Sequence, residues 1–345
     1  MKRYMAGMPA EVEPLVDALQ RPLRDLRLSV TDRCNFRCRY CMPREQFEKQ
    51  FKFLPRSDLL TFEEIVRLVD LLVPLGLDKI RLTGGEPLLR ESLPALVAMT
   101  RERFAGVMAL TTNGTRLQQL AAPLKSAGLD RVTVSLDAMD EPTFAQLTDS
   151  DTSVQEVLRG IDAAAQAGLA PIKVNCVVQR GVNEHAILQL ARHFRSSGHT
   201  LRFIEYMDVG MTNGWSMQHV VSAAEILERL QAEFPLEPVS PGYRGEVASR
   251  YRYTDGTGEV GIIASVTQPF CRDCTRLRIS ADGRAFTCLY AGTGIDLRDA
   301  LRSQDSVEVL AARVRALWAA RRDRYSEERN ERRYLPRVEM SYIGG

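Results

Sequence analysis

The sequence predicts an α/β protein built around a parallel β-sheet. Between residues 26 and 207, six short apolar segments alternate with helical patterns, and each segment is rich in leucine or β-branched residues, as strands buried on both faces are. These segments lie at 26–30, 79–83, 107–111, 131–136, 172–178 and 201–206. Six strand–helix repeats indicate parallel strands joined by right-handed crossovers, and either a partial (β/α)6 barrel or a doubly wound sheet satisfies them. In both arrangements ligands bind at the carboxyl ends of the strands.

Helical patterns occupy the intervals between these strands, at 62–73, 91–103, 117–127, 154–167 and 184–196. The first follows Thr61-Phe-Glu-Glu64, a capping-box arrangement that satisfies free backbone amides at the start of a helix. Gly128, Gly168 and Gly198 follow three of the helices, where a C-terminal cap is expected.

The pattern changes in the C-terminal third of the chain. Segments 258–266 and 275–288 predict antiparallel strands, the latter with a hairpin turn at Asp282-Gly283. A charged helix is expected at about 306–322. We therefore divide the chain into an N-terminal extension, a strand–helix barrel and a C-terminal region, at residues 1–22, 23–221 and 222–345.

Composition places the chain among ordinary globular proteins, with 45% hydrophobic and 26% charged residues. The net charge of +2 gives no argument for nucleic acid or an anionic membrane as a partner. Residues 1–21 lack the continuous apolar core of a secretory signal, and no stretch approaches the roughly 20 apolar residues of a membrane helix. We therefore expect a cytoplasmic protein with neither nucleic acid nor a membrane as its partner.

Three cysteines follow the first strand with the spacing Cys34-x3-Cys38-x2-Cys41. Each iron of a [4Fe-4S] cube normally takes one cysteine thiolate, so three thiolates in one loop leave the fourth iron open to a small molecule. Structural zinc prefers paired C-x2-C knuckles with four ligands. Cysteines this close, without a signal peptide, favour metal binding or redox chemistry over disulfides. The spacing therefore predicts an iron–sulfur cluster, with zinc as the alternative.

A second triad, Cys271-x2-Cys274-x13-Cys288, also supplies three ligands. Zinc with a histidine or aspartate as fourth ligand is the alternative, but no histidine follows His219 in the sequence. A second cluster with an open iron is therefore favoured. Cys176 stands alone in an apolar segment and is interpreted as a buried small hydrophobic residue. The histidines match no motif and are expected in loops or at the surface; they are His185, His193, His199 and His219.

Other motifs fall at the ends of the predicted strands. Thr83-Gly-Gly-Glu-Pro87 follows the second strand, and its glycines would allow backbone groups to approach a ligand, although the motif taken alone favours a tight turn. Thr111-Thr-Asn-Gly114 follows the third strand and is interpreted as a ligand-facing loop. Ser135 closes the fourth strand, where its hydroxyl either binds a nucleoside or is buried against backbone.

Basic side chains accompany the predicted strands. Arg276 and Arg278 share one face of a strand because residues i and i+2 point to the same side, and guanidinium groups suit phosphate oxygens. Four further cations lie on or beside different barrel strands and predict a lumen lined for a polyanion; they are Arg27, Arg81, Lys173 and Arg202. For any one of them a salt-bridged surface position is the alternative. The arginine-rich stretch at 313–333 contains glutamates and is expected to be a solvated helix and linker.

Tyr40, just before the third cysteine, completes a C-x3-C-x2-C loop that is typical of the radical S-adenosylmethionine (SAM) enzymes. Further stretches extend the similarity along almost the whole chain: residues 24–43, 80–87 and 201–207, the second cysteine triad with its two arginines, and the end Gly344-Gly345. In these features the sequence resembles the GTP 3′,8-cyclase family of the radical SAM superfamily. The resemblance implies a partial (β/α)6 radical SAM barrel with a C-terminal antiparallel β extension that carries a second cluster.

The resemblance also implies two [4Fe-4S] clusters and SAM as cofactors. Cys34, Cys38 and Cys41 would hold the cluster that cleaves SAM, while Cys271, Cys274 and Cys288 would hold a cluster whose open iron binds the guanine of GTP. The residues that would contact SAM are Tyr40, Gly85, Ser135 and Met207. The residues that would bind GTP are Arg27, Arg81, Thr111, Lys173, Arg276, Leu277 and Arg278.

The reaction implied by the resemblance is a lyase reaction, the first step of molybdenum cofactor biosynthesis. GTP would become (8S)-3′,8-cyclo-7,8-dihydroguanosine 5′-triphosphate after a 5′-deoxyadenosyl radical removes the ribose 3′ hydrogen. The implied partners are a flavodoxin-like one-electron donor, cyclic pyranopterin monophosphate synthase as acceptor of the product, and a second copy of the chain in a homodimer. The Gly344-Gly345 tail would reach into the active site, whereas the residues alone predict a frayed terminus.

Two segments carry no implied role. Thr148-Asp-Ser-Asp151 lacks the glycine expected after the threonine and is interpreted as a surface turn, and Asp208–Met217 is given no function. Two other functions remain as alternatives. A peptide-modifying radical SAM enzyme with an auxiliary cluster would carry more cysteines in its C-terminal region. A non-enzymatic iron–sulfur electron carrier or zinc module would not need six strand–helix repeats.

Overall fold

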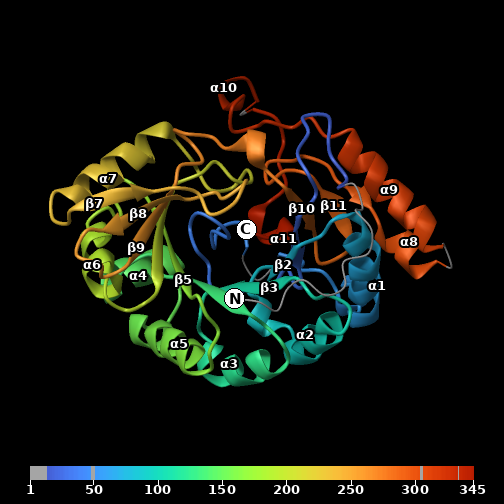
Figure 1. Cartoon of the computed structure of the whole chain (residues 1–345), viewed down its shortest axis with the longest axis horizontal. Helices are drawn as coiled ribbons and strands as arrows, with labels where there is room; N and C mark the ends of the chain where they lie inside the picture. The colour runs from blue at the N-terminus through green and yellow to red at the C-terminus, as the bar shows by residue number, and fades with distance from the viewer. Residues whose placement is uncertain (1–13, 48–50, 304–305, 333) are drawn as a thin grey trace.

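A 12-stranded sheet forms the centre of the computed structural model, which describes residues 14–47, 51–303, 306–332 and 334–345. Residues 1–13 of the expected N-terminal extension, and residue 333 of the arginine-rich stretch, lie outside the described residues. The strands follow the order β12-β11-β10-β1-β2-β3-β4-β5-β6-β9-β8-β7. Helices surround the central strands on the outside, as Figure 1 shows, in the arrangement of a partial barrel.

The six predicted barrel strands are confirmed to within a residue or two at each end: β1 (Asp25–Ser29), β2 (Lys79–Thr83), β3 (Val107–Thr112), β4 (Arg131–Ser135), β5 (Lys173–Val178) and β6 (Thr200–Glu205). The five predicted helices between them are also present: α1 (Phe62–Leu72), α2 (Leu93–Arg101), α3 (Leu117–Ser126), α5 (Val154–Gln166) and α6 (Ala186–Phe194). Between β4 and β7 the structure has two further helices that were not predicted, α4 (Glu141–Thr148) and α7 (Ala223–Gln231).

The C-terminal region supplies the remaining elements. Its strands are β7 (Leu236–Val239), β8 (Ser249–Tyr253), β9 (Glu259–Ile263), β10 (Arg276–Ile279), β11 (Arg284–Phe286) and β12 (Ile295–Asp296). Its helices are α8 (Arg298–Arg302), α9 (Val307–Ala319), α10 (Arg329–Arg332) and α11 (Met340–Ile343), of which α9 is the predicted charged helix.

The prediction that the two C-terminal strand segments are antiparallel was wrong in part. Strand β9 pairs antiparallel with β8 but parallel with β6, and β10 pairs antiparallel with β11 but parallel with β1. The C-terminal region therefore adds one parallel strand to each end of the six-stranded barrel sheet. The apolar pattern of a strand shows which faces are buried, but it does not show which neighbour the strand will pair with.

Local signals at the helix ends behave as the sequence predicts. Thr61 and Glu64 form the reciprocal capping box at the start of α1. Gly128, Gly168 and Gly198 all have positive φ, the left-handed conformation that ends a helix without the steric penalty of a Cβ atom. The turn between β10 and β11 contains Gly283 at φ 86°, as expected for the Asp282-Gly283 hairpin.

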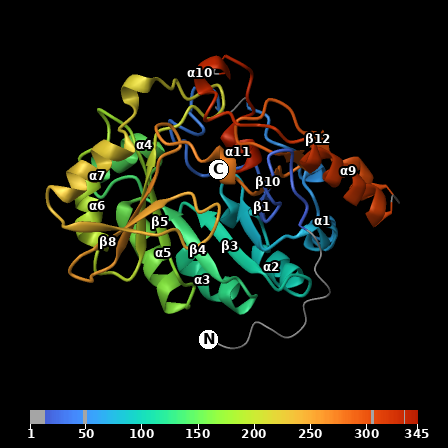
Figure 2. The ribbon, with the colours of Figure 1, turned by 45° about the horizontal axis from the view of Figure 1, so that its top comes forward.

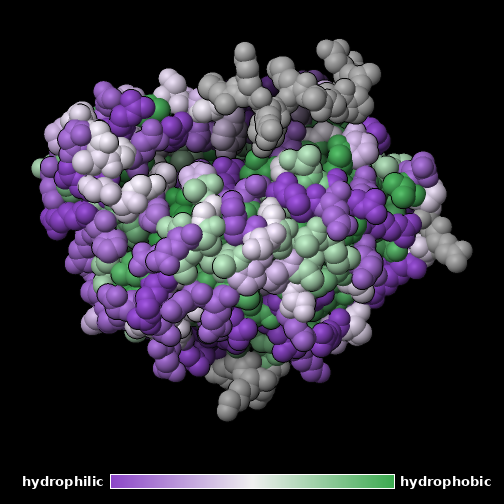
Figure 3. All heavy atoms as spheres, turned by 60° about the horizontal axis from the view of Figure 1, so that its bottom comes forward, coloured by the Kyte–Doolittle hydropathy of each residue, from purple (hydrophilic) through white to green (hydrophobic). Residues whose placement is uncertain are grey.

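The hydrophobic core lies between the sheet and the outer helices. Alternate residues of β1, such as Leu26 and Leu28, are buried with Leu68 of α1, while the intervening Arg27 faces the other side of the sheet. Cys176 is fully buried in this core, as predicted. The outer face shown in Figure 3 is mainly hydrophilic, with hydrophobic residues in smaller areas between. None of the helices in the described ranges has the length and apolar character that crossing a membrane requires.

The C-terminal end of the chain lies at the centre of the barrel. Figures 1 and 2 place α11 and the C-terminus beside β1 and β10 rather than at the outer rim. The structure thus contradicts the prediction of a frayed terminus and agrees with the position that the family resemblance implies. The arginine-rich stretch was also expected to be solvated, but Arg321 and Arg329 are buried in ion pairs.

Candidate active site

Two adjoining cavities lie inside the barrel. The first, of about 200 Å³, is lined by Cys34, Cys38 and Cys41, and the second, of about 190 Å³, is lined by Cys271, Cys274 and Cys288. The residues that line both are Thr111, Asn175, Ile204, Met207, Met340 and Gly345. The two cysteine triads, separated by more than 200 residues in the sequence, therefore border two neighbouring cavities that share part of their lining.

The first cysteine loop is held by its own turn and by the end of α4. The carbonyl of Cys38 accepts hydrogen bonds from the amides of Cys41 (2.9 Å) and Met42 (2.8 Å). The amide of Arg37 donates to the carbonyl of Thr148 (2.8 Å). Asp149, which replaces the glycine expected at this place, adopts φ 44°. The segment interpreted as a plain surface turn therefore supports the cysteine loop, and its left-handed residue explains why glycine suits it.

All four residues that the resemblance assigns to SAM line the first cavity: Tyr40, Gly85, Ser135 and Met207. The two glycines of the Thr83–Pro87 motif also have a structural reason. A Cβ atom on Gly85 would lie 2.3 Å from the carbonyl oxygen of Arg33. Gly84 has φ +150°, and a Cβ atom there would lie 2.4 Å from the carbonyl oxygen of Thr31. Their absent side chains therefore allow the chain leading to Cys34 to pack on this turn.

Glu86 in the same motif is a buried carboxylate with a structural role that the sequence did not reveal. It accepts hydrogen bonds from the amides of Leu88 (2.9 Å) and Asn113 (2.7 Å) and from the hydroxyl of Thr112 (2.7 Å). Burial raises the pKa of Glu86 to about 7, although these hydrogen bonds favour its charged form. The residue fixes the loop after β3 against the turn after β2.

Asp137 is a second buried carboxylate, two residues beyond Ser135, that sequence reasoning missed. It accepts a hydrogen bond from the Tyr40 hydroxyl (2.7 Å) and another from the amide of Val177 (2.8 Å). Burial raises its pKa to about 6. Asp137 lies at the carboxyl end of a barrel strand, and this position alone would have marked it as a site candidate.

The second cysteine triad is surrounded by buried charged residues. Arg21 of the N-terminal extension donates to the carbonyl of Cys271 (2.8 Å) and pairs with Asp17 (2.5 Å), and Arg321 donates to the carbonyl of Cys274 (2.7 Å). Burial disfavours the thiolate of Cys274, but the guanidinium groups of Arg276 and Arg321 outweigh it and lower the pKa of that thiol to about 6. Arg21, near the end of the N-terminal extension, is therefore part of this site.

A row of arginines crosses the second cavity. The register places Arg27 of β1 opposite Arg278 of β10 on one side and opposite Arg81 of β2 on the other. Like charges directly opposite each other destabilise a sheet, and these side chains lie in a cavity rather than in solvent. Arg276, Lys173 and Arg202 line the same cavity, as do Arg131 and Lys79, which were not predicted.

Burial and repulsion between the cations of this cavity lower the pKa values of Arg27 and Lys173. Burial, followed by Arg81 and Arg276, lowers the pKa of Arg27 to about 9. Burial, followed by Arg202, Arg131 and Arg81, lowers the pKa of Lys173 to about 7. Positive charge in this cavity is therefore costly while no anion shares the space.

Of two further predicted GTP-binding residues, Thr111 lines the second cavity and Leu277 does not. Thr111 lines it and accepts a hydrogen bond from Arg81 (2.9 Å). Leu277 is fully buried in the hydrophobic core, because it alternates with Arg276 and Arg278 along β10, and it lines neither cavity. Tyr243 was not predicted but lines the second cavity from the loop between β7 and β8, whose sequence has no motif that would have identified it.

The C-terminal tail ends among these arginines. The carbonyl oxygen of Gly345 accepts a hydrogen bond from Arg27 (2.6 Å), and the carbonyl of Gly344 accepts one from Arg278. Gly344 has φ 76° and lies against Thr83, where a Cβ atom would be only 2.3 Å from the threonine methyl group. A side chain at position 344 would therefore clash with β2.

The donor atoms fit iron–sulfur clusters. Within the described part of the chain, no three His, Cys, Asp or Glu side chains close around a single point as they would for one metal ion; each triad instead lines the wall of a cavity. Burial raises the pKa of Cys34 and of Cys288 to about 12, so these thiols keep their protons until a metal displaces them. Three thiols on one cavity wall match a cube with one open iron.

The chain is similar to known proteins along nearly its whole length. The family model for the Radical SAM superfamily matches residues 28–194, and the model for Molybdenum Cofactor Synthesis C matches residues 199–327. The chain is 54% identical to the GTP 3′,8-cyclase of Acidothermus cellulolyticus, over 96% of this chain and 99% of the relative. It is 49% identical to the protein of that name from Xanthomonas axonopodis pv. citri (96% and 99%) and 45% identical to that from Staphylococcus saprophyticus (97% and 100%).

The crystal structure of Streptococcus suis SuiB bound to S-adenosylmethionine has a similar fold. Its TM-score is 0.59, with 15% sequence identity, over 86% of this chain and 68% of that one. The fold, the first cysteine loop and the family models place the chain in the radical SAM superfamily. Within that superfamily, its full-length relatives show that the chain belongs to the GTP 3′,8-cyclase family.

Proposed function

We propose that this protein converts GTP to (8S)-3′,8-cyclo-7,8-dihydroguanosine 5′-triphosphate, as the first step of molybdenum cofactor biosynthesis. The observation that carries the proposal is a cationic cavity that is lined by the second cysteine triad and shares six lining residues with the cavity of the first. A small anionic substrate held in the second cavity would lie next to a cofactor held in the first. The names of the relatives supply the identity of that substrate.

In this proposal each cavity holds one [4Fe-4S] cluster. Cys34, Cys38 and Cys41 would hold the cluster that binds SAM. The cluster and SAM together would supply a 5′-deoxyadenosyl radical. Tyr40, Gly85, Ser135 and Met207 enclose SAM in the first cavity. Asp137 keeps the Tyr40 hydroxyl in place, while Glu86 keeps the loop after β3 against the turn after β2.

The residues of the second cavity bind and orient GTP. Arg27, Arg81, Lys173, Arg276 and Arg278 receive the triphosphate, since guanidinium groups match phosphate oxygens and an anion relieves the repulsion between these cations. The guanine base lies toward Cys271, Cys274 and Cys288. This orientation directs the ribose toward the first cavity, which it reaches past Thr111 and Met207, residues common to both. The contribution of Leu277 is restricted to its backbone.

The overall reaction conserves the elemental composition of GTP. One hydrogen atom leaves C3′, a bond forms between C3′ and C8 of guanine, and one electron and one proton then restore the hydrogen count, so the product is an isomer of GTP. Both the cleavage of SAM and the last step consume an electron, which we assign to a flavodoxin-like donor. The product passes to cyclic pyranopterin monophosphate synthase, and we propose a homodimer as the assembly.

The test is an anaerobic incubation of the reconstituted protein with SAM and dithionite, with GTP, with ATP or without nucleotide, followed by mass spectrometry. We expect 5′-deoxyadenosine and a new isomer of GTP only in the presence of GTP. Deoxyadenosine with unchanged GTP would retain the radical SAM class and reject the substrate. No cleavage of SAM at full iron loading would leave an iron–sulfur electron carrier as the better explanation.

A further inference from the structure

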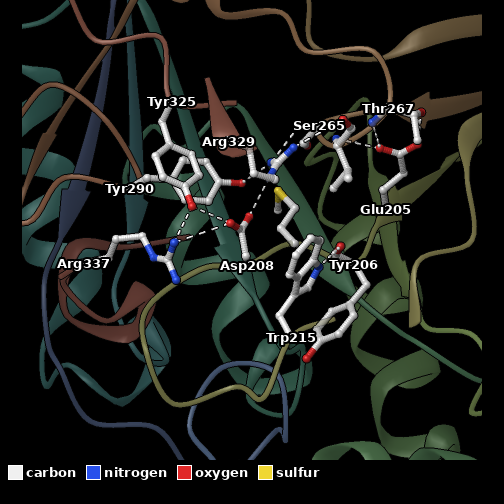
Figure 4. A network of polar contacts seen from close by, with 12 residues as sticks. Glu205, Tyr206, Asp208, Trp215, Ser265, Thr267, Tyr290, Tyr325, Arg329 and Arg337 are labelled. Carbon is white, nitrogen blue, oxygen red and sulfur yellow. Dashed lines mark hydrogen bonds and ion pairs between the residues drawn. The ribbon is translucent and has the colours of Figure 1, made fainter. Parts of the chain in front are cut away.

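Asp208 is the centre of a buried polar network that adjoins residues lining the two cavities. Its carboxylate accepts a hydrogen bond from the hydroxyl of Tyr325 (2.5 Å), another from Nε of Arg329 (3.0 Å), and an ion-pair contact from Nη1 of Arg337 (3.5 Å). Figure 4 shows the three side chains converging on this carboxylate. We call Asp208, Tyr325, Arg329 and Arg337 the clasp. Asp208 was given no role from sequence, and its three partners come from the C-terminal segment.

The clasp joins segments that line the cavities. Asp208 stands between Met207, which lines both cavities, and Val209, which lines the first. Arg329 donates to the carbonyl of Ser265 (3.1 Å) and to the hydroxyl of Tyr290 (3.4 Å), both residues of the second cavity wall. Tyr290 stacks on Tyr325 with ring centroids 4.1 Å apart. A shift of Asp208 would therefore be transmitted to both cavities.

A second set of contacts fastens the tail to the same loop. Arg337 donates to the carbonyl of Gly210 (3.0 Å). The Glu339 carboxylate accepts hydrogen bonds from the amide of Met211 (2.9 Å) and the hydroxyl of Thr212 (3.0 Å). A Cβ atom on Gly210 would lie 2.1 Å from this carboxylate. The tail is thus held at one end by the loop after β6 and at the other by the arginine row.

The buried charge of Asp208 makes the loop after β6 and the C-terminal tail depend on each other. Asp208 is only 2% exposed, and a buried carboxylate without partners is strongly unfavourable. Among the described residues, the side chains that satisfy it belong to residues 325–337. The loop after β6 has hydrogen bonds of its own, such as that from Asn213 to the carbonyl of Met207, but Asp208 keeps its partners only while the C-terminal segment is seated. The seated segment in turn carries Met340 and Gly345 to the boundary between the cavities.

We propose that Asp208 is a positioning residue that seats the C-terminal tail across the two cavities and so keeps cleavage of SAM coupled to conversion of GTP. This inference rests on the proposed function for its kinetic part only. The seating of the tail is a property of the protein whatever its substrate.

The test compares Asp208→Asn with a control at another arginine-paired aspartate, Asp130→Asn. Asp130 accepts hydrogen bonds from Arg101 and from the amide of Met108, but its side chain is 47% exposed, it directly precedes β4, and it lines neither cavity. In Asp208→Asn we expect amide hydrogen exchange to accelerate at least tenfold in residues 207–213 and 337–345 and to stay unchanged in the barrel helices. The control should leave both segments at the wild-type rate.

The kinetic measurement is the amount of 5′-deoxyadenosine formed per molecule of cyclised product. We expect this ratio to rise several-fold in Asp208→Asn, because a loosened wall admits other hydrogen donors, and to stay at the wild-type value in the control. A lower melting temperature alone would not change it. Unaltered exchange in the two segments, or an unaltered ratio, would overturn the proposal.

Glu339→Gln provides the second variant in case Asp208→Asn fails to fold. It weakens the contacts to Met211 and Thr212 and leaves the buried carboxylate in place. Faster exchange confined to residues 337–345 would support the proposal, and wild-type exchange there would overturn it. If the wild-type protein does not convert GTP, the proposed function fails, while the exchange experiment still decides whether the clasp seats the tail.

Discussion

Lys173 offers a quantitative test of how the second cavity binds an anion. Burial and the nearby guanidinium groups of Arg202, Arg131 and Arg81 lower its pKa to about 7 in the free protein. A bound triphosphate offsets both effects by placing negative charge beside the ammonium group, so the pKa of Lys173 should return toward the ordinary lysine range. Binding of GTP is then linked to uptake of a proton at any pH between these two values.

The size of this effect follows from the lowered pKa. At pH 8 a group with a pKa of about 7 is roughly 90% uncharged, so GTP binding should take up roughly 0.9 proton through Lys173. The γ-phosphate is already ionised at this pH and contributes nothing. Because the free-state pKa is the depressed one, the affinity for GTP should fall by up to about tenfold for each pH unit above 7.

The measurement is anaerobic isothermal titration calorimetry at pH 8 in two buffers that differ in ionisation enthalpy. We expect Lys173→Met to take up about one proton fewer per GTP than the wild type. Lys125→Met, which removes an exposed lysine on α3, should match the wild type. Equal proton uptake by all three proteins would show that Lys173 does not face the triphosphate, and the assignment of this residue would be wrong.

Three further predictions concern the cysteine triads. Replacing the second triad with alanine should abolish GTP conversion and leave about half of the iron, which Mössbauer spectroscopy would measure; continued cyclisation would disprove the role of that triad. Gly85→Ala should place a methyl group 2.3 Å from the carbonyl of Arg33, cost about 1–3 kcal/mol in unfolding free energy by denaturant titration, and reduce loading of the first cluster; full loading would refute this. Arg321→Met should raise the pKa of Cys274 and speed chelator-driven loss of the second cluster only, as followed by electron paramagnetic resonance; equal loss from both would contradict it.

The barrel was predictable because its signals are local. Each strand is a short apolar run, and the Thr61 capping box and Gly128 define helix ends through interactions within a few residues. Helix α7 carries the same kind of signal, the capping box of Ser222 and Glu225, and could have been predicted. The parallel pairing of β9 with β6 and of β10 with β1 could not be predicted, because it depends on where strands distant in the sequence lie.

The site was predictable where residues of one kind recur at fixed spacing. Both cysteine triads and the cations of alternating strand positions were found, since spacing and alternation determine where these side chains point. Arg21 and Asp208 were not predicted, because each is a single charged residue outside any motif. Their roles arise only from burial and from partners such as Arg329, far away in the sequence.

The central claim is that the radical generated in the first cavity acts on the ribose of a nucleotide held in the second. The most direct measurement is an anaerobic turnover with GTP deuterated at C3′, analysed by mass spectrometry. We expect one deuterium in each 5′-deoxyadenosine and a cyclised product with the mass of unlabelled GTP, because the lost deuterium is replaced by a solvent proton. Deoxyadenosine without deuterium, alongside a product that keeps its label, would contradict the account.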